Sequence, residues 1–154
     1  MVRKGLSDVA ESESEAISIE IVRESDIVHA RQAGREMAKR LEFGTIMQSR
    51  ITTSISELAR NIYLFAGKGT ITIKAVERNR VRGLQIIAED EGPGIPDVRK
   101  ALEDGYTTIG ALGAGLPGVR RMMDEFEIES RVGKGTRVVA VKWCEPPGKG
   151  NAGG

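Results

Sequence analysis

The stretch "EDEGPGIPD" (89–97) places an acid and two glycines at the end of an apolar run. Asp90 follows "GLQIIAE", a pattern typical of a strand end, and Gly92 and Gly94 lack the Cβ atoms that would keep a flat ligand from the backbone. An ionised aspartate only accepts hydrogen bonds, so Asp90 suits the exocyclic amine of adenine and opposes the carbonyl of guanine. A tight surface turn would explain the same residues, so the stretch alone leaves both interpretations open.

A second pair of polar residues lies in "SELARN". Glu57 and Asn61 are four residues apart, so on a helix they share one face. A glutamate can accept a proton from a hydroxyl or water, and the amide oxygen of an asparagine is a hard ligand suited to Mg²⁺. An ordinary solvated helix face is the alternative interpretation of this pair.

The glycine-rich segment "GALGAGLPG" is a candidate anion site. Gly113, Gly115 and Leu116 directly precede an expected helix near Pro117, whose free N–H groups and dipole could bind a phosphate. A loop that binds no phosphate is the alternative.

The stretch "GKGT" (133–136) contributes Gly133, Gly135 and Thr136 at an expected hairpin. The Thr136 hydroxyl could assist in binding the same base that Asp90 reads. A similar "GKGT" occurs at 67–70, and we interpret the likeness as shared turn chemistry. Neither copy is a P-loop, because both lack the four-residue spacer between the glycines that GxxxxGK[ST] requires.

Hydrophobic periodicity predicts the elements that position these residues. Alternation of period two indicates strands, and apolar spacings of three and four indicate helices. We expect strands at 16–22, 70–76, 83–90, 127–132 and 135–143, and helices at 25–44, 46–67, 97–104 and 116–126. Paired antiparallel strands alternating with paired helices predict an α/β two-layer sandwich, in which helices cover one face of a mixed, mostly antiparallel sheet. One domain should span 16–144, between flexible tails at 1–15 and 145–154.

Composition excludes several classes of protein. The 154 residues hold 23 basic and 22 acidic side chains, and aromatics are only 4%, so nucleic-acid binding is not expected. No apolar run approaches the ~20 residues that a membrane helix needs. The N-terminus has no signal-peptide core, and the single Cys144 cannot form an intramolecular disulfide. We therefore expect a cytoplasmic protein without membrane contact, and we assign Cys144 no role.

The four motifs, taken in order, carry a family resemblance. "ELARN", "DEGPG", "GAGL" and "GKGT" resemble the N, G1, G2 and G3 boxes of the Bergerat-fold (GHKL) ATPase and kinase superfamily, which contains gyrase, Hsp90, MutL and histidine kinases. "ARQAGREMAKRLEFG", "SRITTSISELARNIYLFAGKG" and "GALGAGLPGV" further resemble the stressosome switch serine kinases of RsbT type, relatives of the anti-sigma factor kinases. The resemblance covers nearly the whole expected domain.

This resemblance implies ATP and Mg²⁺ as cofactors and a role for each motif. It implies Glu57 as catalytic base, Asn61 as Mg²⁺ ligand, Asp90 as adenine reader with Gly92 and Gly94 as its turn, Gly113, Gly115 and Leu116 at the phosphates, and Gly133, Gly135 and Thr136 beside the adenine. The implied activity is phosphorylation of serine or threonine on a STAS-domain antagonist. The implied partners are that antagonist, its scaffold and a downstream effector enzyme such as a phosphatase. The oligomeric state stays open.

Other activities of the superfamily fit this sequence less well. A histidine kinase needs a phosphoacceptor histidine on a dimerising helical hairpin, and the single His29 lies in the first expected helix, too close to Asn61 for such a hairpin. The residues flanking His29 include no acid, so we expect it on a helix surface without a catalytic role. A gyrase-type ATPase would need a second domain, which we do not expect here. A non-catalytic switch that binds ATP and a partner remains the alternative function.

Overall fold

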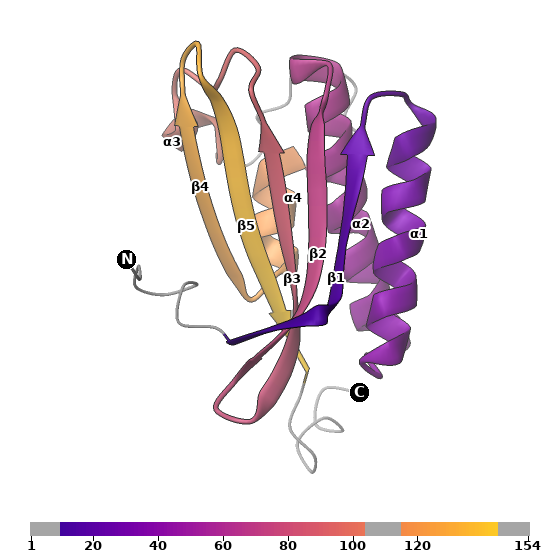
Figure 1. The fold of residues 1–154 in the computed structure, drawn as a ribbon. Coiled ribbons are helices and arrows are strands. Elements are labelled where there is room, and N and C mark those ends of the chain that lie inside the picture. The colour runs from indigo at the N-terminus through magenta and orange to yellow at the C-terminus, as the bar shows by residue number, and fades with distance from the viewer. Residues whose placement is uncertain (1–9, 104–114, 145–154) are drawn as a thin grey trace.

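The computed structural model describes residues 10–103 and 115–144 of the chain. In chain order its elements are β1 (Ala10–Ile21), α1 (Ser25–Arg40), α2 (Thr45–Asn61), the π-helix η2 (Ile62–Ala66), β2 (Gly69–Arg78), β3 (Val81–Asp90), α3 (Val98–Ala101), α4 (Gly115–Met122), β4 (Glu125–Arg131) and β5 (Gly135–Trp143). Apart from η2, this is the predicted order of strands and helices (Figure 1). No helix in the described ranges has both the length and the apolar character to cross a membrane.

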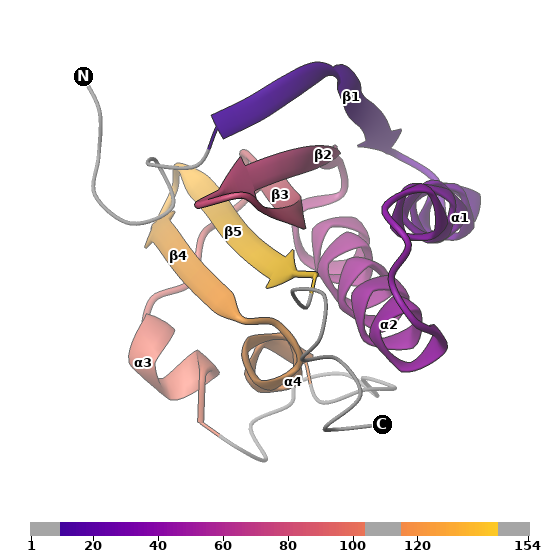
Figure 2. The same ribbon diagram turned by 90° about the horizontal axis from the view of Figure 1, so that it is seen from below.

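The five strands form one sheet in the order β1-β2-β3-β5-β4. All four pairings between described strands are antiparallel. The prediction that the sheet is mostly antiparallel is therefore confirmed, and the prediction that it also contains parallel pairs is wrong. No neighbouring strands are parallel at this edge, because β4 and β5 form a hairpin and β5 runs opposite to β3. Figure 2 shows α1, α2 and α4 on one side of the sheet, which confirms the predicted two-layer sandwich.

The core lies between the sheet and these helices. Alternate residues of β2 and β3 point toward the helices because successive strand side chains face opposite sides. They meet the apolar stripe of α2, and the central members of this core are fully or almost fully buried: Ile71, Ile73, Leu84, Ile86, Ile51, Ile55 and Leu58.

Strand β1 and helix α1 differ from prediction at their ends. The strand starts at Ala10 rather than at residue 16, and its pairing with β2 shifts register between Glu11 and Ala16. Helix α1 ends at Arg40, and Gly44 is instead the residue that precedes α2. The predicted helix extended too far, to Gly44, because the connection also contains apolar residues, and two of them, Leu41 and Phe43, are buried in the structure.

Asp26 does not cap the amides of α1 itself. Its Oδ2 accepts hydrogen bonds from the backbone N–H groups of Val22 and Arg23, at 2.9 and 2.8 Å. The Arg23 and Val22 bonds, and then the neighbouring His29, hold the pKa of this carboxyl below its ordinary value. Asp26 Oδ1 also lies 3.5 Å from Nδ1 of His29, so the histidine has an acidic neighbour three residues earlier, which we had not predicted. His29 is otherwise exposed, as expected.

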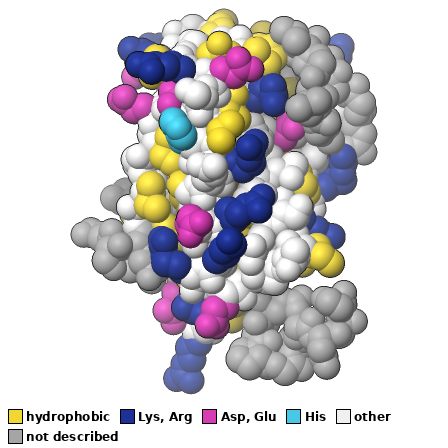
Figure 3. Space-filling model, turned by 90° about the vertical axis from the view of Figure 1, so that its right-hand side faces the viewer, with side chains coloured by type: hydrophobic (Ala, Val, Ile, Leu, Met, Phe, Trp, Pro, Cys, Tyr) yellow, Lys and Arg dark blue, Asp and Glu magenta, His cyan; other side chains and the backbone are white. Residues whose placement is uncertain are grey.

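The helical layer has a polar outer surface. Figure 3 shows Lys and Arg side chains over this face, with apolar groups between them. Among the exposed large apolar residues of α1 and α2 are Val28, at 38%, and Ile46, at 58%. Single apolar residues of this kind are common on protein surfaces and need no partner to explain them.

Candidate functional site

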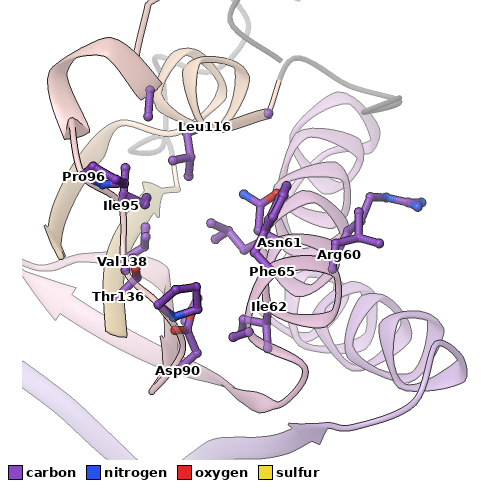
Figure 4. A pocket seen from close by; sticks show the side chains of 18 residues that line it. Arg60, Asn61, Ile62, Phe65, Asp90, Ile95, Pro96, Leu116, Thr136 and Val138 are labelled. Atoms are coloured by element: carbon purple, nitrogen blue, oxygen red, sulfur yellow. The ribbon is translucent and has the colours of Figure 1, made fainter. Parts of the chain in front are cut away.

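A cavity of about 280 Å³ opens at one end of the sandwich, beside the carboxyl end of β3. It lies between the end of α2 and η2 on one side and the starts of α4 and β5 on the other (Figure 4). Six of the predicted site residues line it: Asn61, Asp90, Gly94, Gly115, Leu116 and Thr136. Residues spread over much of the chain therefore meet at one cavity.

Asp90 is the last residue of β3 and pairs directly with Thr136 in β5. Its Oδ1 accepts a hydrogen bond of 2.9 Å from the backbone N–H of Gly92. Its carboxylate accepts no second hydrogen bond from the described residues. An ionised carboxylate has lone pairs on both oxygens, so Asp90 retains acceptor capacity for a ligand that donates.

The cavity walls are apolar and were not predicted as site residues. Ala88, Ile95, Val138, Ile62 and Phe65 all line the cavity. The strand period gave a signal for two of them, because Ala88 is two residues before Asp90 and Val138 is two after Thr136, which puts each pair on one face. Apolar walls beside one carboxylate suit a flat heteroaromatic ring that carries a hydrogen-bond donor on its edge.

The glycines near Asp90 are required for packing, a reason that we did not predict. A Cβ on Gly92 would lie 2.6 Å from Cβ of Ala66, and one on Gly94 would lie 2.2 Å from the carbonyl oxygen of Arg131. A Cβ on Gly135 would lie 2.1 Å from the carbonyl oxygen of Asp90. These glycines allow the loop after β3 to pack against η2 and the β4–β5 hairpin, so the close approach is between protein segments.

The remaining predicted glycines have separate positions. Gly92, Gly133 and Gly135 do not line this cavity. Gly133 lies at the hairpin tip, with its N–H donating to the carbonyl of Pro93 at 2.8 Å. Gly115 begins α4 with a positive φ of 64°. Gly113 lies outside the described residues.

Asn61 and Glu57 occupy different environments on α2. Asn61 is on the side of the helix that faces Leu116 and Ile95 across the cavity (Figure 4). Glu57, one turn earlier, is only 4% exposed and does not line the cavity. The alternative of a solvated helix face is therefore wrong for Glu57, because α2 packs against α1, α4 and the sheet.

Basic residues near the site are few among those described. The sequence offers four basic side chains that could bind a triphosphate: Arg60, Arg99, Lys100 and Arg120. Of these, only Arg60 lines the cavity, and its side chain extends away from the cavity in Figure 4. Arg120 instead donates a hydrogen bond of 3.3 Å to the carbonyl of Leu102. The sequence alone gave no basis for ranking these four residues.

The chain is similar in sequence to several known proteins. A family model described as histidine kinase-, DNA gyrase B-, and HSP90-like ATPase matches residues 47–146. The chain is 62% identical over 125 residues to serine/threonine-protein kinase RsbT of Bacillus subtilis (strain 168), covering 81% of this chain and 94% of that protein. It is 38% identical over 99 residues to an anti-sigma F factor of Caldanaerobacter subterraneus subsp. tengcongensis, covering 60% of this chain and 68% of that protein.

The fold can also be compared with a solved structure. The catalytic domain of histidine kinase ThkA is similar with a TM-score of 0.47 and 17% identity, over 84% of this chain and 99% of that domain. The family model spans the segments from α2 to β5 that line the cavity. The chain belongs to the histidine kinase-, DNA gyrase B- and HSP90-like ATPase family, and within it to the group that includes serine/threonine-protein kinase RsbT.

Proposed function

We propose that this protein is a MgATP-dependent serine/threonine protein kinase that phosphorylates a STAS-domain antagonist in the cytoplasm. It would act as a partner switch in a bacterial stress or sigma-factor pathway. The carrying observation is the cavity in which Asp90 and Thr136 meet between apolar walls, in a chain 62% identical to a protein named as a kinase. The STAS-domain antagonist, its scaffold and a downstream effector such as a phosphatase enter the proposal from the family resemblance.

The cavity fits an adenine nucleotide in its donor and acceptor chemistry. Asp90 offers an acceptor to the exocyclic amine, and Ala88, Ile95 and Val138 offer apolar surface to the flat rings. Gly115 begins a helix whose N–H groups favour negative charge, so the phosphates are expected at that end of the cavity.

Asn61 is the proposed Mg²⁺ ligand. Its carboxamide lines the cavity, and an amide oxygen is a ligand that Mg²⁺ accepts alongside phosphate oxygens and water. MgATP, when bound, supplies the phosphoryl group that is transferred. The role of Asn61 is to fix the ion on the α2 side of the cavity.

Glu57 is the proposed general base. It lies one turn before Asn61 on the same face of α2, and its carboxylate would accept the proton from the serine or threonine hydroxyl as that oxygen bonds to phosphorus and ADP leaves. Because Glu57 is buried and does not line the cavity, the role requires its carboxylate to reach the cavity edge when the substrate is present.

Replacing Glu57 tests the function directly. Glu57→Gln keeps the shape of the side chain and removes the base, so we expect near-normal MgATP binding and phosphorylation of a STAS-domain antagonist slowed by about 10²–10⁴. Binding is measured by calorimetry, and phosphoryl transfer by the appearance of labelled antagonist. The control is Glu36→Gln, the same chemical change at an exposed position of α1, which should behave as wild type.

A non-catalytic ATP-binding switch is the second candidate, favoured by the burial of Glu57 and its absence from the cavity lining. The two candidates separate when antagonist pull-downs are run with and without MgATP. A kinase-driven switch predicts that Glu57→Gln stays on its antagonist when MgATP is added, whereas wild type is released. Release of Glu57→Gln at the wild-type rate would show that Glu57 is not the base and that phosphorylation does not control the partnership.

A further inference from the structure

The hydroxyl of Ser130, near the end of β4, joins three segments around the cavity. It lies 2.8 Å from the backbone nitrogen of Ile95, 3.2 Å from the carbonyl oxygen of Gly135 and 2.7 Å from Oγ1 of Thr136. Ile95 and Thr136 both line the cavity, whereas Ser130 does not. Ser130 thus contacts two residues of the cavity lining without lining the cavity itself.

The proton count of these groups allows all three hydrogen bonds in one arrangement only. The Ile95 N–H can only donate and the Gly135 carbonyl can only accept, so the single Ser130 proton is used on Gly135. A serine hydroxyl has two lone pairs, of which Ile95 occupies one. The contact with Thr136 is then a hydrogen bond only if Thr136 donates its own proton to Ser130.

This arrangement fixes what Thr136 can offer to a ligand. With its proton committed to Ser130, the Thr136 hydroxyl presents only lone pairs to the cavity. Its strand partner Asp90 is likewise an acceptor when ionised. The two residues therefore form an edge that only accepts hydrogen bonds, and this edge is matched by a donating amine and mismatched by a carbonyl.

We propose that Ser130 is a positioning residue that sets the base selectivity of the site by holding Thr136 as an acceptor. The inference rests on the proposed function, since it concerns the nucleotide bound in that cavity. Without the Ser130 hydroxyl, Thr136 is free to turn its proton toward the ligand and can then donate to the guanine carbonyl.

The test is calorimetric titration of the whole protein with ATP and with GTP in the presence of Mg²⁺. Ser130→Ala should lower the ratio of ATP affinity to GTP affinity by about fivefold to tenfold, the scale of one hydrogen bond. Ser130→Thr keeps the hydroxyl and should therefore have the wild-type ratio of ATP affinity to GTP affinity. Ser18→Ala is the matched control, because Ser18 and Thr72 form a similar cross-strand hydroxyl pair at 3.1 Å and neither lines the cavity.

A second variant shows whether Ser130 acts through Thr136. Thr136→Val should also lower the ratio, and adding Ser130→Ala to it should change the ratio no further. If Ser130→Ala does not fold, Thr136→Val alone decides, and an unchanged ratio there overturns the inference.

The remaining outcomes separate the two proposals. If Ser130→Ala weakens ATP and GTP by the same factor, the hydroxyl only supports the Ile95 and Gly135 segments and the inference is wrong, while the proposed function stands. If the wild type binds neither nucleotide, the proposed function is overturned and this inference with it.

Discussion

Asp90 combines a structural bond and ligand-binding capacity in one carboxylate. Asp90→Asn can keep the bond from Gly92 to Oδ1 but replaces the other oxygen by a donating NH₂ group, which opposes the adenine amine. We expect ATP affinity to fall about tenfold to a hundredfold, because in the complex the amide donor would face the donating amine of the base. Calorimetry measures the affinity.

The control for Asp90→Asn is Glu91→Gln, an exposed neighbour outside the cavity lining. Its ATP affinity should equal that of the wild type. Wild-type affinity in Asp90→Asn itself would refute Asp90 as the adenine reader.

Gly94 and Gly133 form a matched pair for testing how the site is built. Both have a positive φ, of 77° and 80°, but only Gly94 has an atom where a Cβ would go, the carbonyl oxygen of Arg131 at 2.2 Å. Gly133→Ala should lower the free energy of unfolding by about 1–2 kcal/mol, the strain of the left-handed backbone alone. Gly94→Ala should cost more and should also weaken ATP binding, because the loop after β3 must move from the hairpin. Equal losses in urea denaturation would show that the Arg131 contact does not hold this loop.

At the residue scale, the sequence was enough to predict that Asp90 and Thr136 line the cavity. It was not enough to predict the packing contacts that require glycine at neighbouring positions. Asp90 and Thr136 are recognisable because their chemistry is local to their own motifs. The need for glycine at 92, 94 and 135 depends on Ala66, Arg131 and the Asp90 carbonyl, which come from other elements. Ser130 gave no signal, since its bond from Ile95, 35 residues away in sequence, forms only in the fold, and its contacts with Gly135 and Thr136 depend on the register of the hairpin.

The start of α1 is an element whose stability should depend on pH. The backbone N–H groups of Arg23 and Val22 lower the pKa of Asp26 in the folded protein, so its contribution is complete above the unfolded value of about 3.8 and is lost as pH falls through the lower folded value. Asp26→Asn should therefore be less stable than wild type near neutral pH, and the difference should shrink in strong acid. Urea unfolding midpoints at about pH 6 and about pH 3 measure this.

The comparison for Asp26 is Glu24→Gln, which removes an exposed carboxylate that makes no capping bond to the helix. It should show no such convergence with acid. If the Asp26→Asn difference is the same at both pH values, the carboxylate charge does not stabilise this turn.

At the element scale, periodicity predicted the helices and strands, while backbone details needed the structure. Residues such as Ile71 and Ile73, or Ile51 and Ile55, repeat at the spacing of their element and are all fully buried. The π-helix Ile62–Ala66 continues α2 with similar apolar residues, so composition does not separate it from an α-helix. The predicted end at Gly67 is confirmed, and its φ of 87° explains why the helix stops there.

At the scale of the whole molecule, the site depends on the strand order. The two-layer sandwich followed from the alternation of paired strands and paired helices. The antiparallel pairing of β3 with β5 could not be predicted from this alternation, because it joins segments separated in the chain by α3, α4 and β4. That pairing places Thr136 opposite Asp90 and so completes the acceptor edge of the cavity.

The central position of β3 also determines how its backbone exchanges hydrogen with solvent. It pairs with β2 over Val81–Asp90 and with β5 over Gly83–Asp90, whereas β4 pairs with β5 alone among the described strands. Amides of β3 should therefore exchange with deuterium only through global unfolding, and those on the outer side of β4 far sooner. Because MgATP binds only the folded protein, it should slow exchange in β3 by the full factor 1 + [L]/Kd, and exchange in the β4–β5 hairpin and at the start of α4 by at most that factor. The carboxylate that we propose to read the base would thus be carried by the segment of the protein that opens last.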